Sequence, residues 1–253
     1  MLPKPARQGM VAVDGGRVWC GEYGVRNRGV PVLLLHGGLA SSDYYGRLIP
    51  ALTGAGYRVI AMDSRGHGRS SVSTRPYSYA LVARDVVTLL DRLGIKRVDL
   101  VGWSDGGIIG FELGLTAPGR VRRMLAFGTN ASLDGLGPGY DSNPVFVRYI
   151  ERSAIESRRF GKSDAQNNAF LAQISVMWGR EPTYSAAQLK AVAMPVTMAI
   201  GQYDEAITVA HVKQVDADLA NSTMVVLPGA SHFGMIQRPA QFNDAVLAFL
   251  RWR

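Results

Sequence analysis

The stretch Gly102–Gly106 reads Gly-Trp-Ser-Asp-Gly, and it constrains the fold more than any other part of the chain. The apolar run Val98–Val101 before it predicts a short buried strand, and Gly107–Leu115 after it predicts a helix. A serine on such a tight strand-to-helix turn is strained, and its hydroxyl is pushed away from the backbone. The flanking glycines remove the Cβ atoms that would clash in that turn. The arrangement suits a nucleophilic Ser104 that attacks a carbonyl carbon.

Strand-like and helix-like segments alternate along the chain on both sides of this turn. The predicted buried strands are 30–35, 58–62, 98–101, 121–127, 196–200 and 223–227, and segments 10–13 and 17–20 predict an opening hairpin. Helices are predicted at 43–53, 78–93, 107–115 and 209–219, and from Pro239 onward. This alternation favours an α/β fold in which helices cover both faces of a mostly parallel sheet.

The glycine spacing after Ser104 predicts an unusually close contact between helix and sheet. Gly106, Gly110 and Gly114 lie four residues apart, so one face of that helix carries no side chains. We expect this bare face to lie against the sheet.

The alternation is interrupted between residues 129 and 192. After a glycine-rich loop, helix patterns follow one another without an intervening strand, and Ser185 with Gln188 matches a capping box. Ligands bind at the carboxyl edge of such sheets, so a helical insertion there is expected to be a lid. The predicted organisation is a core of residues 1–128 and 193–253 with a helical lid at 129–192.

A serine hydroxyl needs a general base, and the chain has four histidines. His232 lies in a loop directly after the last predicted strand, at the edge where Ser104 is expected, and we predict it as the base. His36 and His67 lie in glycine-rich turns, which favours structural hydrogen bonding. His211 falls within a predicted helix and is expected at the surface.

The base in turn needs a carboxylate that holds its tautomer. Asp204 follows the predicted strand 196–200 directly and is the predicted partner of His232. Glu205 and Asp134 are the alternatives. The chain order serine, aspartate, histidine is the order expected for such a fold.

The negative charge that develops on the substrate oxygen needs fixed donors. We predict the backbone N–H of Asp105 as one donor and that of Gly38 as the other, with Leu39 as an alternative to Gly38. The carboxylate of Asp105 has two possible roles. It could hold a substrate ammonium group, or it could bond to the backbone at the start of the helix. The substrate pocket is expected to include Leu39, Trp103, Phe146 and Trp178.

The amino-acid composition further narrows the class of protein. The 253 residues carry 28 Lys and Arg against 20 Asp and Glu, a net charge of +8, but the basic residues are scattered and predict no nucleic-acid partner. The single cysteine, Cys20, excludes an internal disulfide and a cysteine metal cluster. The first residues lack a signal peptide and no apolar run is long enough for a membrane span, so a cytoplasmic protein is expected. We further expect a monomer or homodimer that holds no metal.

Five segments together resemble the α/β-hydrolases, and the resemblance covers essentially the whole chain. They are Leu33–Gly38, Asp63–Ser70, Gly102–Gly107, Gly201–Asp204 and Gly229–His232. The resemblance implies an eight-stranded sheet, a triad of Ser104, His232 and Asp204, and no cofactor. Within the family, Gly102–Ile108 and Gly128–Ala131 are similar to the valacyclovir hydrolase (biphenyl hydrolase-like) branch.

The expected function is hydrolysis of a small carboxylic ester through an acyl-enzyme. A lactonase, a perhydrolase of the non-haem haloperoxidase type and a C–C bond hydrolase would use the same residues and stay open. Dehalogenases and epoxide hydrolases of this family have an aspartate where this chain has Ser104, which argues against them. A ligand-binding receptor with little turnover is the alternative of another class.

Overall fold

The computed structural model describes residues 2–251, in which eight strands form one sheet in the order β1-β2-β4-β3-β5-β6-β7-β8. The strands are β1 (Arg7–Val13), β2 (Gly16–Tyr23), β3 (Val32–Leu35), β4 (Val59–Asp63), β5 (Val98–Trp103), β6 (Val121–Phe127), β7 (Val196–Gly201) and β8 (Ser222–Leu227). Strand β2 runs antiparallel to β1 and β4, and all other neighbours pair in parallel. The predicted α/β fold with an eight-stranded, mostly parallel sheet is confirmed.

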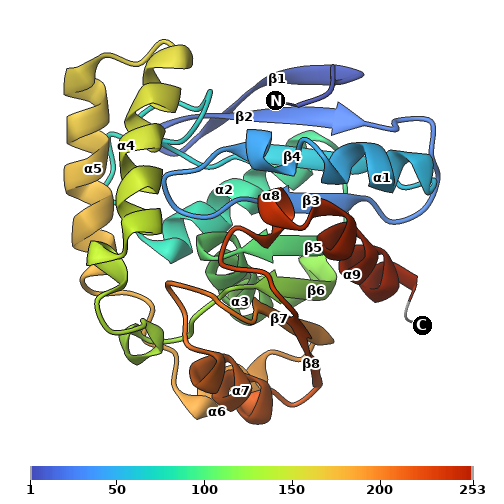
Figure 1. The fold of residues 1–253 in the computed structure, drawn as a ribbon. Helices are drawn as coiled ribbons and strands as arrows, with labels where there is room; N and C mark the ends of the chain where they lie inside the picture. Colours follow the sequence, from blue (N-terminus) through green and yellow to red (C-terminus); the bar gives the residue numbers. More distant parts are fainter. Residues whose placement is uncertain (1, 252–253) are drawn as a thin grey trace.

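Helices cover both faces of this sheet (Figure 1). They are α1 (Leu48–Gly54), α2 (Tyr79–Arg92), α3 (Asp105–Thr116), α4 (Pro144–Arg159), α5 (Asp164–Trp178), α6 (Ala186–Ala191), α7 (Val209–Asp218), α8 (Gly234–Gln237) and α9 (Pro239–Arg251). Side chains alternate along β3, so Leu33 and Leu35 belong to the apolar core that includes side chains of α2, α3 and α7, whereas Val32 and Leu34 belong to the core that includes side chains of α1 and α9. The sheet therefore has an apolar core on each face.

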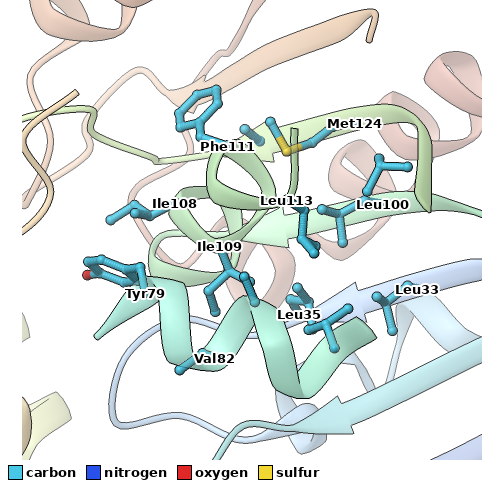
Figure 2. Packing of buried hydrophobic residues seen from close by; sticks show 14 of the residues in the cluster. Leu33, Leu35, Tyr79, Val82, Leu100, Ile108, Ile109, Phe111, Leu113 and Met124 are labelled. Atoms are coloured by element: carbon cyan, nitrogen blue, oxygen red, sulfur yellow. The ribbon is translucent and has the colours of Figure 1, made fainter. Parts of the chain in front are cut away.

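Helix α3 lies very close to the sheet, as its glycines predict. A Cβ on Gly106 would lie 2.0 Å from the carbonyl oxygen of Leu35, and one on Gly110 would lie 2.1 Å from Sδ of Met124. Gly114 instead faces Val192, just before β7. Figure 2 shows the apolar side chains of α2 and α3 packed together beside those of β3 and β5.

We expect Gly106→Ala to destabilise the protein by about 1–3 kcal/mol, because the new methyl group would overlap backbone atoms that cannot rotate away. The measurement is the urea unfolding midpoint. Gly54→Ala is the matched control, since Gly54 also lies in a helix and a Cβ there meets nothing within 4 Å. Equal midpoints for the two variants would contradict this account of the helix–sheet contact.

The single helix predicted at 43–53 is wrong. A 3₁₀ turn forms at Ser42–Tyr45, and helix α1 begins only at Leu48. The reason is Pro50, which has no N–H and is tolerated only within the first turn of a helix. A helix that began at Asp43 would have placed this proline in its interior.

Between β6 and β7, helices α4 and α5 form a hairpin that lies beyond the carboxyl ends of the parallel strands (Figure 1). The predicted capping box of Ser185 and Gln188 is confirmed at the start of α6, and Ser163 with Gln166 forms a second one at the start of α5. Both fix helix starts within the insertion. Every helix in residues 2–251 is too short or too polar to cross a bilayer.

Candidate active site

Ser104 lies on a strained turn between β5 and α3. Its φ is +53° and its ψ is −119°, a conformation that side-chain-bearing residues rarely adopt. Its N–H donates to the carbonyl of Phe127 at 2.8 Å, which fixes the turn to the neighbouring strand β6. A Cβ on Gly102 would lie 2.5 Å from the backbone of Gly106, so the two glycines of the motif allow the turn to close.

His232 and Asp204 contact each other at the same edge of the sheet. Nδ1 of His232 lies 2.9 Å from each carboxylate oxygen of Asp204, and this aspartate also accepts backbone N–H groups of Ala206 (3.0 Å) and Ile207 (2.8 Å). These bonds fix the carboxylate, and its bond to Nδ1 requires a proton there. The other ring nitrogen, Nε2, is then free to act as a base.

Glu205, the first alternative to Asp204, accepts the backbone N–H of His232 at 2.9 Å and leaves the imidazole to Asp204. Gly128 allows this close approach. Its φ is +57°, and a Cβ there would lie 2.9 Å from both Asp204 Oδ2 and His232 Nδ1.

Ser104 and His232 line one cavity of about 180 Å³ under the α4–α5 hairpin. The four predicted pocket residues, Leu39, Trp103, Phe146 and Trp178, also line it. The ring of Phe146 lies 5.6 Å from the imidazole of His232, measured between centroids. The sequence therefore identified residues from five separate segments that line one cavity.

The two residues whose N–H groups are the predicted oxyanion donors lie close together. Gly38 and Asp105 both line the cavity, and a Cβ on Gly38 would be 2.8 Å from Oδ2 of Asp105. One on Gly37 would be 3.1 Å from the Cβ of Ser104, so the turn after β3 lies directly against the serine. The N-terminus of α3 also points its free N–H groups and its partial positive charge toward this region.

The carboxylate of Asp105 makes contacts that the sequence did not predict. It accepts the hydroxyl of Tyr79 on α2 and Nε1–H of Trp178 on α5, each at 3.0 Å. Burial raises the pKa of Asp105, and these two bonds oppose the rise. Both bonds come from side chains and not from the nearby backbone, so Asp105 joins α2 and the α4–α5 hairpin to the serine turn.

The other three histidines have structural partners. His36 donates from Nδ1 to the carbonyl of Gly37 at 2.8 Å and accepts the N–H of Ser64 at Nε2, and His67 donates from Nδ1 to the carbonyl of Arg65 at 2.9 Å. Burial lowers the pKa of both rings, and the predicted structural bonding is confirmed.

The surface position expected for His211 is wrong. Its Nε2 accepts the N–H of Ala131 at 3.0 Å, and its ring packs against Gly135, where a Cβ would lie 2.4 Å from the ring. His211 thus holds the loop after β6.

Three further residues of the cavity wall make hydrogen bonds that the sequence did not predict. Tyr149 on α4 donates its hydroxyl to the carbonyl of Gly38, and Glu181 accepts the N–H of Tyr79 at the start of α2, at 3.0 Å. All three side chains line the cavity. No local pattern predicts them, because each acts on a segment far away in the sequence.

The fold and the candidate site together define an enzyme of the α/β-hydrolase fold, and the family model described as "alpha/beta hydrolase fold" matches residues 30–148. The chain is 29% identical over 246 residues to RutD of Variovorax paradoxus, which is named as a carbamate hydrolase; the match covers 88% of this chain and 92% of that protein. It is 28% identical over 214 residues to 3-oxoadipate enol-lactonase 2 of Acinetobacter baylyi, with 77% and 79% covered.

Among solved structures, the chain is similar to Est816, described as an N-acyl homoserine lactone degrading enzyme. The TM-score is 0.78 at 25% sequence identity, and the match covers 95% of this chain and all of the other. The three similar proteins are named for different substrates, so the similarity is consistent with a hydrolase and singles out no substrate.

Proposed function

We propose that this enzyme is a serine hydrolase of small carboxylic esters that works through an acyl-enzyme. The observation that carries the proposal is that the strained Ser104 lines the same cavity as His232, whose imidazole is paired with Asp204. Ser104 attacks the ester carbonyl while Nε2 of His232 accepts the hydroxyl proton. The imidazolium then protonates the departing alcohol. Water, activated by His232 in turn, releases the acid and frees the serine.

The supporting groups follow from their contacts. Asp204 keeps the proton on Nδ1 and stabilises the imidazolium. The N–H groups of Gly38 and Asp105 hold the oxyanion, and each such donor contributes about 3 kcal/mol to barrier lowering. Residues 129–192 act as the lid, with Phe146 and Trp178 shaping the substrate pocket beside Leu39 and Trp103.

Charge around the cavity favours substrates without a carboxylate. Asp105, Asp141 and Glu181 line it, and among residues 2–251 its wall includes neither lysine nor arginine, although the chain carries a net charge of +8. An anionic substrate would lose its water there without gaining a cationic partner. Neutral esters avoid this cost. Lactones are cyclic esters and are the second candidate, because two similar proteins are named for lactones.

The direct test is exposure of the purified protein to a fluorophosphonate probe and to a panel of short p-nitrophenyl esters and lactones. The proposal expects covalent labelling that maps to the peptide containing Ser104, a burst of p-nitrophenol and steady turnover. Without labelling and without turnover the serine hydrolase proposal fails, and a ligand-binding role replaces it.

A charge series tests the substrate class. We expect the kcat/KM of monomethyl succinate to be at least about thirty-fold below that of methyl butyrate. An unfavourable electrostatic free energy of about 2 kcal/mol lowers a rate constant by about that factor. Release of acid can be followed by pH-stat titration. Methyl 2-aminobutyrate in the same series tests the ammonium role of Asp105, because Asp105→Asn should then reduce its advantage over methyl butyrate.

Asp141→Asn is the matched control for this series, since Asp141 lines the same cavity but is exposed. Equal rates for the anionic and neutral esters would overturn the substrate class. Equal discrimination of the amino ester in wild type and Asp105→Asn would remove the ammonium role.

A further inference from the structure

The turn that holds Gly38 is strained at its next residue. Leu39 has a φ of +61°, and within residues 2–251 only Leu39 and Ser104 adopt a positive φ without being glycine. Such a conformation persists only where surrounding groups fix it, and it is often part of a mechanism. Contacts with neighbouring segments must therefore hold this turn.

Contacts from the α4–α5 hairpin hold it. The hydroxyl of Tyr149 on α4 donates to the carbonyl of Gly38. The indole of Trp178 on α5 packs so closely on Gly38 that an added Cβ would lie 2.3 Å from Cζ2. At the other end of the turn, Ser42 bonds to Asp63 through both its N–H (2.8 Å) and its hydroxyl (2.5 Å). One end is thus fixed by the core and the other by the hairpin.

The bond from Tyr149 fixes one particular peptide unit. The carbonyl of Gly38 and the N–H of Leu39 belong to the same planar group, so rotating that group changes ψ of Gly38 and φ of Leu39 together. Glycine permits such a rotation easily because it has no Cβ. A donor on the carbonyl removes this freedom, and it does so only while α4 is packed against the core.

We propose that Tyr149 is a positioning residue for the oxyanion turn: its bond to the carbonyl of Gly38 fixes the peptide unit between Gly38, which carries the proposed donor, and Leu39, which carries the alternative one, and makes catalysis depend on the packing of α4. The inference rests on the proposed function, since it assigns the oxyanion to this turn. Tyr149 does not touch the reacting atoms in this role. It acts through the backbone of Gly38 and Leu39.

The packing of Tyr149 allows a clean substitution. Its ring is 8% exposed and lies against Tyr44, Phe146 and Phe233, with ring centroids 6.1, 6.0 and 4.9 Å away. Tyr149→Phe keeps this aromatic packing and removes only the hydroxyl. Tyr44→Phe is the matched control, because Tyr44 lies in the same aromatic cluster and its hydroxyl makes no hydrogen bond with Gly38.

The experiment measures kcat, KM and the Ki of a trifluoromethyl ketone, which forms a tetrahedral adduct and needs the oxyanion donors. Rates are expressed per active site titrated with a fluorophosphonate, so misfolded protein does not count, and the melting temperature is recorded. For Tyr149→Phe we expect kcat to fall about tenfold, KM to change less than about twofold and Ki to rise by the same factor as kcat falls.

Two results would overturn the inference while leaving the hydrolase intact. One is a kcat and Ki for Tyr149→Phe equal to those of Tyr44→Phe in an active wild-type enzyme. The other is a fall in kcat without a matching rise in Ki, which would indicate a structural effect that is not specific to the oxyanion. Failure of the proposed function is distinguishable from both, because the wild-type protein itself would then show neither turnover nor labelling.

Discussion

Replacement of Ser104 with alanine is expected to lower kcat for a short ester by about 10⁵- to 10⁶-fold, because loss of a nucleophile removes the acyl-enzyme pathway entirely. What remains should be the modest acceleration given by the oxyanion donors and by binding. Hydrolysis of p-nitrophenyl acetate at high enzyme concentration gives the residual rate. Fluorophosphonate labelling of the variant should disappear as well.

Ser153→Ala is a suitable control for Ser104→Ala. Ser153 lies on α4 and is buried, and its hydroxyl donates within its own helix to the carbonyl of Ile150 at 2.7 Å. Its activity should match that of wild type. If Ser104→Ala kept more than a few per cent of the activity, the nucleophile would have to be another residue.

The second large effect is expected for Asp204→Asn, with a fall in kcat of about 10⁴-fold. The amide can donate a hydrogen bond to Nδ1 of His232, which would leave the imidazole proton on Nε2, the nitrogen that is proposed to accept the proton of Ser104. Binding should change little, because Asp204 contacts the ring on the side away from the nitrogen that is proposed to react. Steady-state kinetics separate the two parameters.

Glu205→Gln is the sharpest comparison for Asp204→Asn. Glu205 is the neighbouring carboxylate and accepts the backbone N–H of His232, a bond that a glutamine oxygen can also accept. The kcat of Glu205→Gln should fall by less than about tenfold, because the glutamine oxygen keeps the hydrogen bond and only the negative charge of the acceptor is lost. A larger loss in Glu205→Gln than in Asp204→Asn would reassign the carboxylate of the triad.

The fold was predictable because its strong signals are local. The central strands β3, β4, β5 and β7 are short and mostly apolar, and parallel strands bring their carboxyl ends to one edge, so the loops with Ser104, Asp204 and His232 could be expected together. The errors were also local in origin. Pro50 favours a helix start close before it, which is where α1 begins, and the prediction of a helix from Asp43 did not take this into account.

The cavity wall was harder to predict, because its bonds join distant segments. One of the two partners of the Asp105 carboxylate is Trp178, 73 residues away, and Glu181 accepts the N–H of Tyr79 across 102 residues. A tyrosine in a helix pattern carries no sign of which carbonyl its hydroxyl will reach. Only the packed arrangement of α2, α4 and α5 around the turn reveals those bonds.

The acidic wall of the cavity also bears on how a catalytic cycle ends. Ester hydrolysis turns a neutral molecule into an alcohol and a carboxylate anion, and the anion forms beside Asp105 with no lysine or arginine of residues 2–251 in the wall to retain it. Repulsion then favours departure of the acid toward the basic exterior of a protein with a net charge of +8. The acidic side chains that favour a neutral substrate would thus also promote release of the carboxylate product. Accumulated acid should therefore inhibit the enzyme only weakly.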